Sequence, residues 1–385
     1  MRVNIDKMIN KLFISWIVIT PFIVWRGMYE GVKVIWFLSG AFFLILHWII
    51  GLLRKPNCLK LILSDLFYFA WLVVLLISSI YGIHPTESIL GGSYRHQGVI
   101  FFLTLWLVGK KIPTLSQKEK KLLIGGIAFG VIAESLIVMF QHLTSGLYFG
   151  RPLGTFGEPN AVAAFLSLGT YFVIEALKKR RLYLGIVSVV VSTFLTFSRA
   201  GIASLLLVLG NLAFKRRRKS SKLLVAILVF AIIGVVIVFK KASITRGVSM
   251  FENRTLFREI AIKYIREKPV FGWGMESQEY LYDKEFALRK MPLEGMIVDR
   301  SHNLFLDIAL WSGLMGLGLF IIWLLFIVLE IVKNNKYNKL PALSAFLIFS
   351  MFQPLGVVHC LMLFVIIYLR KVSVFAIIVY SMVKD

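Results

Sequence analysis

The chain has 385 residues, of which 58% are hydrophobic, and its mean hydropathy is +0.80. The net charge of +24 would also suit a nucleic-acid-binding protein, but the basic residues fall in short clusters between long apolar runs, as membrane topology requires. This pattern argues against a separate basic, nucleic-acid-binding domain. The two cysteines, Cys58 and Cys360, form neither a disulfide framework nor a metal-binding spacing.

Twelve apolar runs follow one another along the chain, and most can cross the ~30 Å hydrocarbon core of a bilayer as a helix. They predict an all-α, polytopic membrane bundle of about twelve transmembrane helices, folded as a single integral membrane domain over residues 1–385. Lys7 and Lys11 precede the first run as in a signal peptide, but no clear cleavage site follows, so we expect a retained first helix. The runs cover residues 12–25, 34–53, 61–82, 98–109, 122–143, 159–177, 182–197, 200–214, 223–239, 304–330, 340–353 and 357–369.

The basic residues divide unevenly between the two sides of such a bundle. If each run spans once, 27 of the 44 Lys and Arg residues fall on one side, and five fall on the other side outside residues 240–303. Because loops rich in Lys and Arg stay in the cytoplasm, both termini are expected there. The apolar residues 372–383 are short for a span and either cross the membrane or lie at its interface.

Residues 240–303 form a large loop on the external side, between the ninth and tenth spans. Within it, residues 254–268 have apolar residues at helical spacing and predict an amphipathic helix along the membrane surface. Pro269, with the glycines of PVFGWG, ends this helix. Residues 275–300 have no clear period, and Ser301 or Asn303 is suited to cap the next span.

Arginines stand out on this external side because membrane topology places few basic residues there. Arginine presents a rigid fork of donors that suits phosphate oxygens, so the arginines indicate an anionic ligand such as a membrane-bound diphosphate. His302, where the loop returns to the membrane, can take a proton from an attacking hydroxyl. Simpler roles are also open: Arg95 and Arg151 can extend to lipid headgroups, and His302 can be a satisfied polar group beside Asn303.

Four segments together resemble the O-antigen ligase and polymerase superfamily of bacterial envelope glycosyltransferases. Each is a weak signal alone, but their order and spacing agree, as does the large external loop late in the chain. A fifth segment, GGSYRHQGVIF (91–101), is also similar and makes Arg95 a secondary candidate. The four segments are GTFGEPNAVAAF (154–165), TFSRAGIASLLL (196–207), NRTLFREIAIKYIREKPVFGWG (253–274) and SHNLFLDIALWSGLMGLGLF (301–320).

The resemblance implies transfer of a glycan from an undecaprenyl-diphosphate donor to an acceptor hydroxyl at the outer face of the bacterial cytoplasmic membrane. It implies no metal, cofactor or nucleotide sugar. Arg199 and Arg254 would hold the donor diphosphate, and His302 would activate the acceptor. Arg258 stands where the family often has tryptophan, so it is either a further phosphate contact or an exposed residue. Arg95 is a further diphosphate candidate, and Asn303, Asn160 and Arg151 are expected to support the site.

Two other classes of function remain open. A multi-span transporter, or a flippase for lipid-linked glycans, would also have many spans and arginines, although the chain shows no internal repeat. A non-enzymatic partner in envelope assembly would use residues 240–303 as a docking surface. Within the resemblance, the acceptor is a lipid core sugar, a growing glycan or a protein hydroxyl, and the sequence does not choose among them.

Overall fold

The computed structural model describes residues 2–54, 63–92, 94–144, 147–148, 150–215, 249–290 and 298–369. This part of the chain is helical, which confirms the predicted class, apart from one short antiparallel pair, β1 (Leu147–Tyr148) and β2 (Arg151–Pro152). Every predicted apolar run except one coincides with a helix. The exception, 223–239, lies outside the described residues, as does 372–383.

The chain forms two compact units, and each is described by itself. Unit 1 comprises Met1–Phe37, Leu115–Phe251 and Asn338–Ile366, and unit 2 comprises Leu38–Thr114, Glu252–Tyr337 and Ile367–Asp385. The helix α2 (Glu30–Arg54) begins in unit 1 and continues in unit 2.

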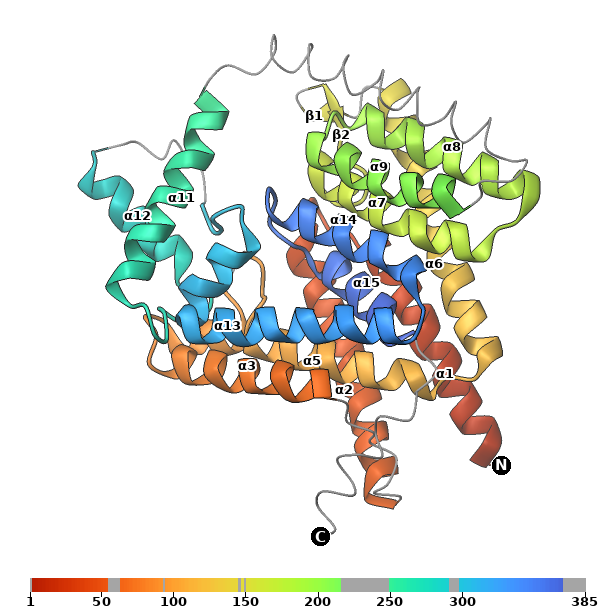
Figure 1. Cartoon of the computed structure of the whole chain (residues 1–385), viewed down its shortest axis with the longest axis horizontal. Helices are drawn as coiled ribbons and strands as arrows, with labels where there is room; N and C mark the ends of the chain where they lie inside the picture. Colours follow the sequence, from red (N-terminus) through yellow and green to blue (C-terminus); the bar gives the residue numbers. More distant parts are fainter. Residues whose placement is uncertain are drawn as a thin grey trace. The chain divides into compact units, whose positions relative to one another are not determined.

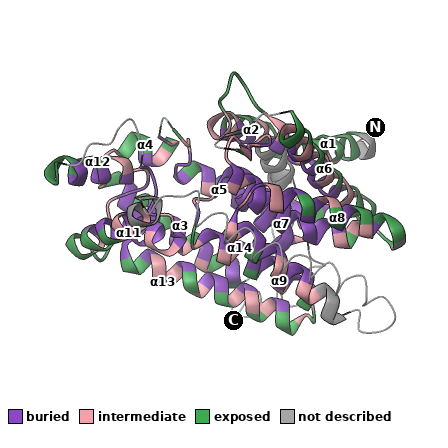
Figure 2. Cartoon of the chain, turned by 90° about the horizontal axis from the view of Figure 1, so that it is seen from above, coloured by how far each residue is buried: buried purple, intermediate pink, exposed green. Residues whose placement is uncertain are grey.

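Unit 1 is organised around α7, which is buried along most of its length (Figure 2). Pro159 occupies the first turn of α7, where a missing N–H costs nothing. The helix contacts four neighbours, α6, α8, α9 and α14, and α1 packs on α6 (Figure 1). The helices of this unit are α1 (Arg2–Ile19), α6 (Gln117–Leu143), α7 (Pro159–Ala176), α8 (Lys179–Leu195), α9 (Arg199–Lys215), α14 (Leu340–Ser350) and most of α15 (Val357–Tyr368).

Unit 2 is organised around two long helices that lie side by side, α3 (Leu63–Ile80) and α13 (Leu304–Lys333) (Figure 1). The helices α4 (Pro85–Leu90) and α5 (Val99–Lys111) pack against α3. Two further helices come from the predicted external loop: α11 (Ser249–Glu267), which lies in unit 2 from Glu252 onward, and α12 (Gln278–Leu288). The predicted amphipathic helix is therefore present and begins earlier than expected, whereas α12 was not predicted.

Apolar surface confirms that this is a membrane protein. Among the described residues, α3, α6 and α13 are each long and apolar enough to cross a membrane. The helices α9 and α15 have shorter apolar stretches. Four phenylalanines on α2 and α6, namely Phe42, Phe43, Phe129 and Phe140, are 64–71% exposed. Exposed apolar surface on this scale is typical of helices that face lipid. The expected number of twelve spans stays a prediction.

The long helix α13 is interrupted at Gly313, whose backbone has φ 67° and ψ −173°. In a continuous helix the amides of Leu314 and Met315 would donate to Leu310 and Trp311. Here they donate instead to the carbonyls of Pro269 and Val270, at 2.7 and 3.4 Å. At the interruption, these two amides therefore find their acceptors in another part of the chain.

The interruption is filled by the segment PVFGWG, residues 269–274, which we call the plug. The amides of Trp273 and Gly274 donate to Leu310 and Trp311 at 2.7 and 3.1 Å, and so serve the carbonyls that the interruption releases. A Cβ on Gly272 would lie 2.4 Å from the carbonyl oxygen of Leu310, and one on Gly313 would lie 2.0 Å from that of Val270. Only glycine fits at either position. Irregular backbone within a membrane is tolerated where protein supplies such partners.

Candidate functional site

His302 lies in the short segment before α13, at the end of the loop that is predicted to be external. Its backbone is left-handed, with φ 57°, which is unusual for a residue with a side chain. The imidazole is half-buried and stacks on the ring of Phe257, with 5.9 Å between the ring centroids. Asn303 caps α13 by accepting the amides of Phe305 and Leu306, which confirms one of the two predicted caps. The cap and the stacked ring fix the position of the histidine from two sides.

The helix α11 presents two arginines on the face that contains Phe257. Arg254 and Arg258 lie three residues before and one residue after Phe257, a spacing that places all three on one broad face. Both arginines are half-buried. Because Phe257 contacts His302 directly, this face brings two permanent positive charges to the side of α11 that packs on the histidine.

A small hydrophobic core holds α11 in this orientation. It joins α11, α12, residue 298 and the first half of α13, and we call it the loop core. Tyr282 strengthens it, since its hydroxyl donates to the carbonyl oxygen of Phe257 at 3.0 Å. The loop core consists of Phe257, Ile260, Ala261, Tyr264, Leu281, Tyr282, Phe286, Val298 and Leu310.

A network of buried charges lies immediately before His302. Arg95 forms an ion pair with Asp299, and Arg300 forms one with Glu276 at 2.6 Å. The guanidinium of Arg300 is only 3% exposed and also lies over the ring of Trp311, 5.1 Å from its centroid. The predicted diphosphate candidate Arg95 therefore has an acidic partner within the chain.

The electrostatics of this network keep Asp299 and Arg300 charged. Burial alone would raise the pKa of the Asp299 carboxyl, but Arg95 and Arg300 outweigh it and hold that pKa below its usual value. Burial would lower the pKa of the Arg300 guanidinium, but Glu276 and Asp299 raise it above its usual value. Asp299 is also close enough to His302 that a positive charge on the imidazole lowers the pKa of the Asp299 carboxyl.

In unit 1, Arg199 is the first residue of α9, directly after the turn that ends α8. The predicted tight turn is therefore present. Ser198 precedes Arg199, and its side chain accepts the amide of Gly201 at 3.3 Å. Arg199 thus projects from a helix N-terminus, where unsatisfied amides carry partial positive charge. Together the guanidinium and the helix end are suited to an anion.

Arg151 and Asn160, two of the expected supporting residues, meet beside this turn. The Arg151 guanidinium donates to the carbonyl oxygen of Thr196 at 2.6 Å and to the amide oxygen of Asn160 at 2.9 Å. Asn160 in turn donates to Glu158 at 3.0 Å. Arg151 therefore ties the turn before Arg199 to the start of α7, and its role in the chain is more than an extension to lipid headgroups.

The loop before α7 is anchored by buried polar groups. Glu134 accepts both the amide and the hydroxyl of Thr155, at 2.7 and 2.8 Å, and Lys33 donates to the carbonyl oxygen of Thr155 at 2.6 Å. On α15, His359 accepts the amide of Gly356 at Nδ1, so Nε2 carries the proton and donates to Ala161 at 2.8 Å. His359 is thus a satisfied structural histidine in the core of unit 1.

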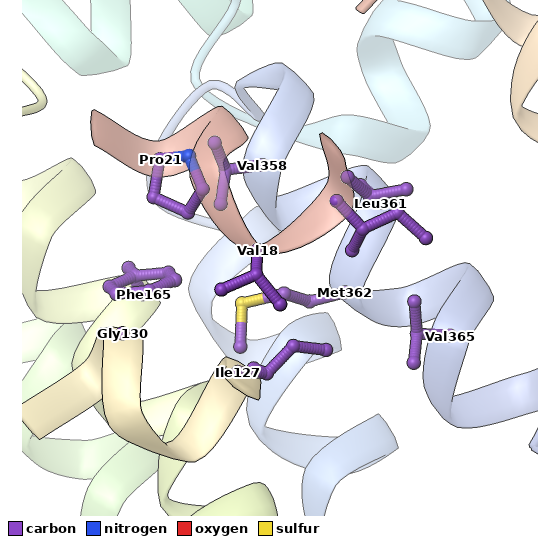
Figure 3. Close-up of a pocket in the computed structure, with 10 residues that line it drawn as sticks. Val18, Pro21, Ile127, Gly130, Phe165, Val358, Leu361, Met362 and Val365 are labelled. Carbon is purple, nitrogen blue, oxygen red and sulfur yellow. The ribbon is translucent and has the colours of Figure 1, made fainter. Parts of the chain in front are cut away.

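An apolar pocket in unit 1 is separate from these charged residues. It lies among α1, α6, α7 and α15, and Val18, Phe165 and Met362 point into it (Figure 3). The space open to the centre of a water molecule is about 10 Å³, enough for roughly one water. It is too small for a sugar. Among the described residues, no group of three or more His, Cys, Asp or Glu side chains could hold a metal ion.

The sequence prediction missed the partners of His302. Asp299 and Arg300 lie three and two residues before it, and two charges at the edge of a membrane span are a signal that could have singled them out. Phe257 and Glu276 could not have been found in this way, because the fold alone brings Phe257 to the histidine and Glu276 to Arg300.

Comparison with known proteins supports the resemblance. Residues 184–321 match the family described as O-Antigen ligase, a range that contains three of the four motif segments and leaves out 154–165. The chain is 25% identical over 354 residues to a protein described as ComP-specific O-oligosaccharyltransferase, from Acinetobacter baylyi (strain ATCC 33305 / BD413 / ADP1). The match covers 85% of this chain but 57% of that relative, so the chain spans little more than half of its length. The predicted likeness to these membrane glycosyltransferases is confirmed.

Proposed function

Because the chain is similar to enzymes of the O-antigen ligase and oligosaccharyltransferase type, we propose that it transfers a glycan from an undecaprenyl-diphosphate donor to an acceptor hydroxyl. The reaction takes place at the outer face of the bacterial cytoplasmic membrane. The observation that carries the proposal is the face of α11, where Arg254 and Arg258 flank Phe257, and Phe257 stacks on His302. This helix face combines a proton acceptor, the imidazole stacked on it, with two arginines that can bind a diphosphate.

In the proposed reaction the acceptor oxygen attacks the anomeric carbon of the donor sugar. The bond from that carbon to the diphosphate breaks, the hydroxyl proton passes to His302, and the lipid diphosphate leaves. Arg254 and Arg199 stabilise the negative charge of the leaving group, and Arg258 is a further contact. A lipid diphosphate is already a good leaving group, so this scheme needs positioning, charge stabilisation and one proton acceptor.

The proposal extends to topology. Twelve spans, cytoplasmic termini and an external loop of residues 240–303 would place α11 and His302 on the side where lipid-linked glycans are joined. The charge distribution supports this orientation, because 27 of the 44 Lys and Arg residues fall on the opposite side.

The acceptor belongs to one of three classes: a lipid core sugar, a growing glycan, or a protein serine or threonine. The name of the Acinetobacter relative favours including a protein acceptor. A purified full-length chain in lipid nanodiscs should therefore be incubated with undecaprenyl-diphosphate oligosaccharide and each acceptor class. We expect product with one class, together with released undecaprenyl diphosphate.

His302→Ala should abolish this transfer while donor binding persists, because the proton acceptor is lost and the arginines remain. His84→Ala is the matched control: His84 lies in the same unit, with its ring against that of Tyr280. Near-normal turnover by His302→Ala at equal protein level would contradict the assignment. A wild-type chain that moves the donor across a membrane but joins no glycan would favour a flippase instead.

A further inference from the structure

The buried charges before His302 have a consequence for its chemistry. We propose that Asp299 and Arg300 are positioning residues for His302: Arg300 fixes the segment that carries the imidazole, and Asp299 places a permanent negative charge beside it. This inference rests on the proposed function, in which His302 takes the proton of the acceptor.

Arg300 anchors the segment to the residues at the start of α12. Its guanidinium donates to Glu276 at 2.6 Å, to the backbone oxygen of Asp299 at 2.7 Å and to Gln278 at 3.4 Å. These contacts tie the backbone before His302 to the start of α12. The donors of a guanidinium are spread over a rigid plane, whereas the three donors of a lysine ammonium share one atom and cannot reproduce this arrangement.

The next residue is fixed as firmly. The amide and hydroxyl of Ser301 both donate to Asp307, at 2.8 and 2.6 Å, and Gln278 donates to the same carboxylate oxygen at 2.6 Å. His302 therefore lies between two anchored neighbours, Ser301 and the capping residue Asn303. Its left-handed backbone is strained, and such a conformation persists only where the surroundings over-determine it.

Buried ion pairs are poor devices for stability alone, because well-packed apolar residues of similar volume often serve as well or better. Here the pairs converge directly beside the proposed proton acceptor. A role in the chemistry of His302 explains why the ion pairs lie at this position. Ion pairs that only stabilised the fold could lie anywhere in the core.

The charge balance around His302 explains why a carboxylate is needed. When His302 takes a proton it becomes positive, and neighbouring guanidinium groups oppose that change. An ionised carboxylate offsets them and keeps the histidine able to accept the proton. The charged groups nearest to His302 in sequence or on the helix face beside it are Arg254 and Arg258 on α11, Asp299 and Arg300 in its own segment, and Asp307 in the first turn of α13. Arg95 pairs with Asp299 and Glu276 with Arg300. The remaining charged groups on these elements include Glu259, Lys263, Arg266 and Glu267 on α11 and Glu279, Asp283, Lys284 and Glu285 on α12, of which Lys263 and Glu285 pair with each other.

The first test measures His302 directly and does not depend on glycan transfer. Diethylpyrocarbonate modifies the neutral imidazole, so its rate at His302 across pH, read by peptide mass spectrometry, gives the midpoint of deprotonation. Asp299→Asn should lower this midpoint by about one pH unit, since a nearby negative charge is removed. Glu259→Gln is the matched control, because Glu259 lies on α11 in an exposed ion pair with Arg289, and it should leave the midpoint unchanged.

If thermal unfolding shows that Asp299→Asn is not folded, Arg95→Gln provides a second variant. It removes the positively charged partner of Asp299, which leaves more net negative charge near His302, and should therefore raise the midpoint of His302 deprotonation. Opposite shifts in the two variants support the proposal. A midpoint within about 0.2 pH unit of wild type in the folded variants would overturn it.

The second test separates positioning from donor binding. Asp299→Asn and Arg300→Lys should each lower kcat on the order of tenfold to a hundredfold and leave the KM for the lipid-linked donor unchanged within about threefold. Asp299→Glu, which restores the charge, should recover part of kcat. Unchanged kcat in both folded variants would overturn the inference. A wild-type chain without transfer activity would refute the proposed function, while the His302 midpoints would still decide the inference.

Discussion

Arginines on the predicted external side divide into two kinds by their contacts. Arg95, Arg151 and Arg300 have partners that the fold supplies: a carboxylate, a backbone carbonyl with an amide oxygen, and a buried carboxylate. Arg254 and Arg258 lie half-buried on a helix face beside the stacked Phe257. In the proposed reaction the second kind contacts the donor diphosphate, so the two kinds should respond differently to the same substitution.

Arg254→Lys should lower kcat/KM for the lipid-linked donor at least about tenfold, although the positive charge is kept. Lysine cannot offer the paired donors that arginine offers to phosphate oxygens. Arg266→Lys is the control, since Arg266 is exposed in the last turn of the same helix, and it should behave as wild type. Steady-state kinetics in nanodiscs measures both, and equal losses in the two variants would contradict a specific role for Arg254.

At the scale of elements, the main feature of unit 2 is the plug in the interrupted helix α13. Four backbone hydrogen bonds join residues 269–274 to the helix around Gly313. The same segment contacts the residues that follow α3, because the amide of Ile83 donates to the carbonyl oxygen of Trp273 at 3.3 Å. The plug thus connects α11, which carries Arg254, to the first half of α13, which begins two residues after His302.

Gly313→Ala should destabilise unit 2 by about 1–3 kcal/mol or more, because a Cβ would meet the carbonyl oxygen of Val270 and the backbone there is left-handed. Gly318→Ala is the matched control on the same helix, since its added Cβ has open space, and it should be neutral or slightly stabilising. Thermal unfolding in nanodiscs compares the two. Equal unfolding temperatures would show that the helix accepts the alanine without displacing the plug.

Sequence patterns predicted elements well where each element carries its own signal. Apolar runs gave the positions of the long helices, and the apolar stripe of residues 254–268 predicted α11. The helix α12 escaped because two of its five buried positions, Gln278 and Glu285, are polar, so its apolar residues alone do not show the helical period. Pro269 and the plug glycines correctly marked a helix end, but their docking into α13 depends on a backbone some forty residues later.

At the scale of the whole molecule, orientation in the membrane is the prediction that most needs a direct measurement. Lys284→Cys on α12 and Lys118→Cys in the first turn of α6 both replace exposed residues, in a chain whose native Cys58 and Cys360 are changed to alanine. A membrane-impermeant maleimide should label position 284 in intact cells. It should label position 118 only after permeabilisation, because the basic segments are expected in the cytoplasm. The reverse pattern would invert the topology.

The candidate site could be predicted in outline from the sequence. His302, Arg254 and Arg199 stood out through motif order and through charge on an unexpected side. Their surroundings could not be predicted, because the contact of His302 with Phe257 spans forty-five residues of sequence and the pair of Arg95 with Asp299 spans about two hundred. Such partners are set by packing of distant elements, for which a single sequence carries no local signal.

The interrupted helix also constrains how the protein is made. The plug leaves the ribosome before α13, so it must wait near the membrane until the helix arrives. Until the two meet, α13 holds amides and carbonyls without partners near its middle, and each unsatisfied group in lipid costs several kcal/mol. Insertion of this helix and docking of the preceding loop are therefore expected to occur as one step of biogenesis, so that the membrane retains α13 only once residues 269–274 have joined it.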